Sequence, residues 1–264
     1  MSKAARKPGM PAPRAADTLG FDELARGYNF QNVSCWHRVF AHQVATTLGA
    51  AQGPTRVLDI GCGRGIGRHI EFQRQIAAHA GEMWGIEPDE DVEPETGIFH
   101  HFQHALMEGA ELPADTFDVA YACMVMEHVA DPDAFLAAVA RVLKPGGYFY
   151  FVTPNARHFV IRAGRLCQRL GIDELVLRLV KSRQQIEAYH YPVTYRFNDE
   201  RAIARVAATA GLAEPECIYL EAQGVRGYLR GPLRPIYHLS VLKRRLIRDP
   251  RALATIVGRV RKPG

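Results

Sequence analysis

Four glycines at alternate positions follow a short apolar segment that contains one acidic residue. Residues 56–60 (RVLDI) include Asp59, and the glycines after them are Gly61, Gly63, Gly65 and Gly67. An apolar run bounded by glycines is typical of a buried parallel strand followed by a tight turn where a ligand approaches the backbone. Residues 66–80 are expected to form a helix whose free N–H groups face that turn. This order of elements predicts a nucleotide-type binding site.

The glycine spacing distinguishes two kinds of nucleotide site. The dinucleotide fingerprint G-x-G-x-x-G would need a third glycine at position 66, where Ile66 stands instead. The segment D-I-G-C-G-R-G, residues 59–65, resembles motif I of the class I S-adenosylmethionine (SAM) dependent methyltransferases. In that family the turn surrounds the methionine part of SAM, and the acid before it helps to hold the ammonium group. The resemblance implies these roles for Gly61, Cys62, Gly63, Gly65 and, as the acid, Asp59.

A second acidic position ends the next predicted strand, residues 83–87. Glu87 lies 22 positions after Gly65 and precedes Pro88. A carboxylate at this place can accept hydrogen bonds from both hydroxyls of a ribose. We expect Glu87 and Pro88 to contact the cofactor, with Asp89 and Glu90 as alternatives to Glu87.

Two further stretches resemble the same family. Residues 107–113 (MEGAELP) match the acidic stretch before the fourth strand, which implies that Glu108 receives the adenine amino group beside the Gly109 backbone. Residues 117–155 resemble the pattern F-D-x-x-x-x…E-H-x…L-K-P-G-G, with Met124 expected at the cofactor. Three such stretches in the family's order identify the chain as a SAM-dependent methyltransferase, whose product from SAM is S-adenosylhomocysteine.

The predicted fold is α/β, a Rossmann-like three-layer sandwich. Its sheet should have seven mostly parallel strands, and the resemblance implies that the last, residues 254–260, runs antiparallel between the fifth and sixth. Residues 1–18 are rich in Ala, Pro, Lys and Arg and are expected to be a disordered basic lead-in. Residues 19–264 should form a single domain, with a helical cap at 21–50, a lid insertion at 156–195 and a basic amphipathic insertion at 224–250.

Metal binding is not expected. Three histidines within five positions, His100, His101 and His104, alternate with phenylalanines in a way that suits a strand and its exit. The five cysteines are widely spaced without C-x-x-C, which favours neither a disulfide framework nor a zinc site and fits a reducing cytoplasm.

The charge is unevenly distributed. The chain carries a net charge of +5, and residues 224–248 contain seven Lys or Arg and no acid. An anionic partner and a solvated helix face explain this equally well. With the basic amphipathic stretch 157–186, it predicts contact with a membrane surface or a lipid-phosphate carrier. Nucleic acid is a weaker prediction because no RNA-binding module is recognisable. We expect a cytoplasmic protein, peripheral at the inner membrane surface, and make no prediction of its oligomeric state.

The acceptor side is less explicit in the sequence. If the acceptor is an alcohol or phenol, a base helps to remove its proton, and the candidates are His128, His158 and His190, with Tyr191 and Tyr195 as residues that orient the groups. The Glu-His pair that contains His128 can instead serve packing or capping. Predicted contacts of the substrate are Tyr28, Trp36, Asn155, His158 and Tyr195. His158 is also a candidate base, and Trp36 can alternatively pack its helix against the sheet.

The predicted reaction is O-methylation of a small molecule, with a lipid-linked, glycosidic or natural-product hydroxyl as acceptor. The alternatives are C-methylation of a quinone-type ring and N-methylation of an amine. Outside the enzymes, the chain could be a SAM-binding partner or regulatory protein. The absence of an N/D-P-P-Y/F stretch after the fourth strand argues against methylation of adenine or amide nitrogen.

Overall fold

The computed structural model describes residues 10–169, 171, 193–222 and 234–264. Eight strands form one sheet in the order β1-β7-β8-β6-β5-β2-β3-β4. All neighbouring strands are parallel except β8, which runs antiparallel to both β6 and β7. The strands are β1 Asn29–Phe30, β2 Arg56–Ile60, β3 Glu82–Ile86, β4 His101–Gln103, β5 Phe117–Cys123, β6 Leu143–Pro154, β7 Glu216–Glu221 and β8 Thr255–Arg261.

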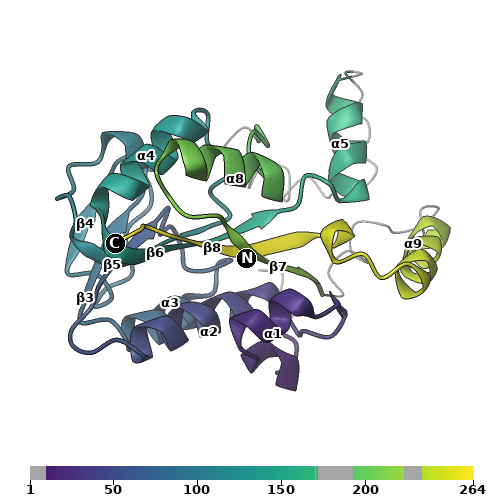
Figure 1. Ribbon diagram of the computed structural model, residues 1–264, viewed down its shortest axis with the longest axis horizontal. Coiled ribbons are helices and arrows are strands. Elements are labelled where there is room, and N and C mark those ends of the chain that lie inside the picture. The colour runs from purple at the N-terminus through teal and green to yellow at the C-terminus, as the bar shows by residue number, and fades with distance from the viewer. Residues whose placement is uncertain (1–9, 170, 172–192, 223–233) are drawn as a thin grey trace, which may run out of the picture.

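The helices cover both faces of this sheet (Figure 1). One face carries α1, α2 and α3, the other carries α4 and α8, and α5 and α9 stand at one end of the molecule. The α helices are α1 Phe21–Arg26, α2 Trp36–Gly49, α3 Ile70–Ala77, α4 Pro132–Val142, α5 Phe159–Arg169, α8 Glu200–Thr209 and α9 Arg234–Leu246. Short 3-10 helices are η1 Ala15–Thr18, η2 Met107–Gly109 and η5 Pro250–Ala252.

The strands alternate their side chains between two apolar cores. In β5, Ala120 belongs to the core under α4 and α8, whereas the next residue, Tyr121, belongs to the core under α2 and α3. This alternation follows from the two-residue period of a strand. The predicted three-layer sandwich is confirmed, and so is the antiparallel last strand between the fifth and sixth predicted strands. The sheet has eight strands instead of seven, because the two-residue β1 adds a parallel edge beside β7.

Capping residues set the helix boundaries where the sequence carries them. Asp131 accepts a hydrogen bond from the Ala134 amide at 3.1 Å and Pro132 occupies the first turn of α4. Helix α3 differs from its prediction because it begins at Ile70 and not at residue 66. The preceding residues continue as turns, in which Gly65, Gly67 and Arg68 have positive φ angles that a helix excludes.

The N-terminal region is more ordered than predicted. Residues 1–9 lie outside the described part of the chain, but Ala15–Thr18 form η1 and the Asp17 side chain is buried. The Asp17 carboxylate accepts hydrogen bonds from the amides of Ser34 at 2.6 Å and Arg14 at 2.8 Å. A buried carboxylate needs such donors, and here they order a segment whose composition indicates disorder. Within the described residues, no helix is long and apolar enough to cross a membrane.

Gly258 tests the packing of the antiparallel strand. It lies directly opposite Phe151 of β6, and a Cβ at position 258 would come within 2.2 Å of the Phe151 ring. We expect Gly258→Ala to lower the free energy of unfolding by about 1–3 kcal/mol through overpacking, measured by chemical denaturation. In a chain that also carries Phe151→Leu, the combined loss should be smaller than the sum of the two single losses. Additive losses would show that the contact between residue 258 and the Phe151 ring does not cause the loss of stability.

Candidate functional site

The glycine turn leaves β2 and folds over the end of β3. The carbonyl oxygen of Ile86 accepts hydrogen bonds from the amides of Gly61 at 2.8 Å and Cys62 at 3.1 Å. Gly61 and Gly65 have φ angles of +69° and +87°. A Cβ at Gly61 would lie 2.5 Å from a Val125 methyl group, and one at Gly65 would lie 2.9 Å from the Ile70 backbone. The turn is therefore a cradle of bare backbone that no other residue type could form without strain.

Glu87 reaches this turn from the end of β3. One oxygen, Oε2, accepts a hydrogen bond from the Gly63 amide at 2.8 Å, and Oε1 accepts one from the Asp89 amide at 3.2 Å. The side chain is buried, and this burial raises the pKa of Glu87. A carboxylate has about four acceptor sites, so two stay available for ribose hydroxyls. The structure thus places Glu87 against the glycine turn, two features that the sequence predicted from separate motifs.

Asp59 lies beneath the turn. Its Oδ2 accepts hydrogen bonds from Gln73 Nε2 and from the Tyr121 hydroxyl, each at 2.6 Å. The side chain is only 2% exposed, and burial raises the pKa of Asp59 to about 7. Gln73 also donates to the Cys62 carbonyl at 3.1 Å, which joins the acid to the turn. Direct contact of Asp59 with an ammonium group stays a prediction.

Gln73 and Tyr121 are site residues that the sequence did not predict. They come from α3 and β5, so nothing in the local motif marks them as partners of Asp59. The only signal is that each is a hydrogen-bonding residue at a buried position of its element.

The start of α2 closes the other side of the turn. A Cβ at Gly67 would lie 2.1 Å from His37 Nε2 and 3.1 Å from the Trp36 ring. The Trp36 and His37 rings stack with their centroids 3.6 Å apart. Burial lowers the pKa of His37 to about 4, so the ring is neutral at pH 7. Trp36 therefore packs its helix against the turn, and its contact with substrate stays a prediction; His37 was missed.

The predicted adenine side is formed by η2 and the exit of β5. Glu108 and Gly109 are exposed in η2, whose Met107 is anchored in the core. Met124 follows β5 with a φ of +56° and donates its amide to the Val152 carbonyl at 2.9 Å. Pro88 is half-buried directly after Glu87. Cofactor contacts of these residues stay predictions.

The Glu-His pair follows β5 on this side of the sheet. Glu127 is 6% exposed, and burial raises the pKa of its carboxyl to about 7, whereas His128 is half-buried. The Glu127 carbonyl oxygen accepts hydrogen bonds from the amides of Thr194 at 2.7 Å and Tyr195 at 3.2 Å. Glu127 therefore anchors the segment that contains the predicted substrate residue Tyr195. This anchoring role of Glu127 was not predicted from the sequence.

Two predicted substrate residues have other partners. Asn155 is fully buried and donates to the carbonyls of Arg251 at 2.9 Å and Leu253 at 2.7 Å. His158 is 2% exposed, with its Nε2 3.3 Å from a Glu221 oxygen, and burial lowers its pKa to about 3. Both side chains are therefore engaged within the protein, and their contact with a substrate and the role of His158 as a base stay predictions. Their partners are distant in sequence, so no local pattern reveals them.

Three other residues predicted for the acceptor side are Tyr28, His190 and Tyr191. The Tyr28 hydroxyl donates to the Arg244 carbonyl at 2.8 Å and so contacts α9. His190 and Tyr191 lie outside the described residues.

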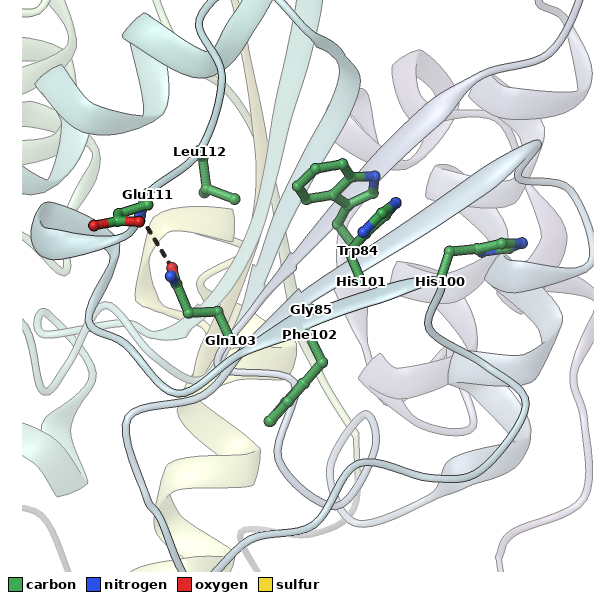
Figure 2. A pocket seen from close by; sticks show the side chains of 8 residues that line it. All are labelled: Trp84, Gly85, His100, His101, Phe102, Gln103, Glu111 and Leu112. Carbon is green, nitrogen blue, oxygen red and sulfur yellow. Dashed lines mark hydrogen bonds between the residues drawn. The ribbon is translucent and has the colours of Figure 1, made fainter.

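The histidine-rich stretch lies at the β3–β4 edge, in the wall of a pocket of about 400 Å³ (Figure 2). His101 Nε2 is 2.9 Å from Glu82 Oε1, and His100 Nδ1 accepts the Met83 amide at 3.1 Å. In the part of the chain that the structure describes, no group of three His, Cys, Asp or Glu residues could hold a metal ion. None of the pocket's lining residues belongs to the glycine turn.

The fold and the site together define a class I SAM-dependent methyltransferase. The bare-backbone cradle and the Glu87 carboxylate fit the methionine part and the ribose of SAM, respectively. A family described as "Methyltransferase domain" matches residues 25–214, more than half of the chain. The chain belongs to this family.

Individual relatives agree with this assignment. A ubiquinone biosynthesis O-methyltransferase of Salmonella enteritidis is 36% identical over 170 residues, which cover 54% of this chain and 68% of that protein. One of Hahella chejuensis is 35% identical over 114 residues, 40% of this chain and 46% of that protein. The chain thus spans about half the length of some of these relatives. A SAM-dependent methyltransferase from Thermotoga maritima shares the fold at a TM-score of 0.50 and 16% identity, covering 86% of this chain and 90% of that chain.

Glu87→Gln tests the ribose contact. The amide keeps one acceptor oxygen but loses the charge, so we expect the Kd for SAM to rise by about 10–100-fold, measured by isothermal titration calorimetry. Glu93→Gln is the matched control, because Glu93 is an exposed acid six positions further on in the same loop. An equal loss of affinity in both variants would remove Glu87 from this role.

Asp59→Asn tests the buried acid. Because burial raises the pKa of Asp59 to about 7 in the folded chain, this group stabilises the fold below about pH 4, and that contribution is lost as the pH rises to about 7. Asparagine keeps an oxygen that accepts from Gln73 and Tyr121 but does not titrate. Between pH 4.5 and 7.5, the variant should therefore lose about 2–4 kcal/mol less unfolding free energy than the wild type. Identical pH profiles in urea denaturation would contradict a buried, titrating Asp59.

Proposed function

We propose that this protein transfers the methyl group of SAM to a hydroxyl oxygen of a small molecule, with S-adenosylhomocysteine as the second product. The observation that carries the choice of methyl donor is the contact of the Glu87 carboxylate with the Gly63 amide of the bare-backbone turn. The choice of oxygen is supported by relatives named ubiquinone biosynthesis O-methyltransferases. The name that these relatives share favours oxygen as the acceptor atom over the ring carbon or amine nitrogen, which the sequence had left as alternatives.

The chain's own residues hold the donor and prepare the acceptor. SAM, when bound, supplies a methyl group on a sulfonium, whose carbon–sulfur bond breaks as the bond to the acceptor oxygen forms. The glycine turn and Asp59 position the methionine part, Glu87 binds the ribose, and Glu108 with Gly109 binds the adenine. Trp36 and His37 at the start of α2 exclude water from one side of the turn.

His128 is the proposed base for the acceptor proton. His128 is half-buried and follows β5. The end of β5 lies beside the glycine turn, because Val125 contacts Gly61. An imidazole there can take the hydroxyl proton while the oxygen gains the methyl group. Glu127 keeps Tyr195 nearby through its carbonyl oxygen, and His190 and Tyr191 stay proposed catalytic residues from the sequence alone.

We propose further that the acceptor is lipid-linked or anionic and that the protein works in the cytoplasm, peripheral at the inner membrane surface. The support is the basic stretch 224–248, which has no acid, and its helix α9 at one end of the molecule (Figure 1). A metal ion is not needed for this scheme, because the sulfonium already makes the methyl group electrophilic.

The direct test is methyl transfer from isotope-labelled SAM to a panel of acceptors, analysed by mass spectrometry. The panel contains a ring with adjacent hydroxyls bearing an isoprenoid tail, the same ring without a tail, a glycoside and a primary amine. We expect the label on a hydroxyl oxygen. Label on the amine or on a ring carbon would overturn the proposed acceptor atom, and SAM binding without transfer to any acceptor in the panel would favour the non-catalytic partner.

His128→Gln separates catalysis from binding. Loss of the base should lower kcat about 10²–10⁴-fold while the Kd for SAM stays unchanged. His79→Gln is the control, since His79 is an exposed histidine two residues after the end of α3. A normal kcat in His128→Gln would exclude it as the base.

A further inference from the structure

Helix α9 is attached to the domain by an inner face that carries both apolar and charged side chains. Tyr237, Val241 and Arg244 share this face, since they are spaced by four and three residues. Val241 packs against the apolar core, and the Arg244 side chain is buried, with its guanidinium in an ion pair with Glu221. The same guanidinium lies over the ring of Phe159 at 5.4 Å and donates to the Ala252 carbonyl at 3.1 Å. These contacts fix which side of α9 faces the sheet.

The outer face of α9 is apolar and exposed. Leu239, Leu242 and Leu246 lie on it at helical spacing, and they are 66%, 55% and 75% exposed. Seven large apolar side chains are exposed among the described residues, and five of them are in α9 or directly after it. The other two in this group are Ile236 and Ile247. Such a concentration marks an interaction surface and not the scattered exposure that any protein shows.

Basic residues flank this apolar face. Lys243 and Arg245 are exposed beside it, and no acid lies between residues 224 and 248. At the same end of the molecule, α5 carries the exposed Arg162 and Leu166 (Figure 1). Aliphatic side chains bordered by cations match the layered chemistry of an anionic bilayer, where acyl chains lie beneath negative headgroups.

We propose that the outer face of α9, formed by Leu239, Leu242 and Leu246 with Lys243 and Arg245 beside them, docks the protein on an anionic lipid bilayer. This names the surface for the peripheral contact in the proposed function, on which it rests. Because α9 and α5 stand at the end of the sheet where β6 ends, docking through α9 turns the acceptor side of the domain toward the bilayer (Figure 1). A lipid-linked acceptor then reaches the site without leaving the membrane.

The test is flotation of the full chain with vesicles. Wild-type protein should float with vesicles of equimolar phosphatidylglycerol and phosphatidylcholine, much less with phosphatidylcholine alone, and less at high salt. In Leu239→Asp/Leu242→Asp the bound fraction should fall by about tenfold or more, because two carboxylates replace apolar groups at a negative surface. Leu106→Asp is the matched control: Leu106 is 63% exposed and lies outside α9, so its substitution should leave binding unchanged.

The outcomes separate this proposal from the proposed function. Circular dichroism and thermal unfolding establish that each variant is folded, and methyl transfer to a water-soluble acceptor should be the same in the wild type and the double variant. Equal vesicle binding by the wild type and the double variant would overturn the proposal, as would absence of binding to anionic vesicles at low salt. A dimer in solution that the double variant abolishes would overturn it too, since the face would then belong to a second copy.

Discussion

The buried carboxylate of Asp59 is the constraint on which the site depends. Tyr121 of β5 and Gln73 of α3 both donate to its Oδ2, and Gln73 also donates to the Cys62 carbonyl, which joins the turn to them. A buried acid without donors would be costly, so strand, helix and turn must come together for the fold to tolerate it. The raised pKa shows that the donors offset only part of the desolvation. The burial of Asp59 thus lowers the stability of the fold while its hydrogen bonds fix the turn.

The turn is shaped by contact as much as by hydrogen bonding. Val125 touches it at Gly61, and His37 touches it at Gly67. These two residues belong to the segment after β5 and to α2, so the acceptor side and the N-terminal cap are both complementary to the same backbone. A side chain at either glycine would displace one of these elements. The glycines therefore serve the packing around the ligand site as well as the ligand itself.

The sequence was informative where a signal is local. Asp131 with Pro132 predicts the start of α4. The glycine spacing distinguishes a SAM turn from a dinucleotide turn. Each of these signals depends only on residues a few positions apart. The sequence was uninformative where partners are distant. Asn155 binds carbonyls about a hundred residues later, and the burial of Asp17 depends on Ser34, so polarity alone suggested a substrate contact in one case and disorder in the other. Long-range pairing decides whether a polar residue is functional or structural.

The buried cluster at the base of α9 follows the same logic. Glu221 lies between Arg244 and His158, and because burial and the nearby Arg244 lower the pKa of His158 to about 3, the imidazole is neutral and Arg244 alone balances the carboxylate. Buried ion pairs contribute little net stability but strongly disfavour arrangements that separate them. Rotating α9 to bury its leucines would strand Glu221 without its cation. The ion pair therefore holds α9 in the orientation that leaves its apolar face exposed. An ordinary amphipathic helix would bury that face instead.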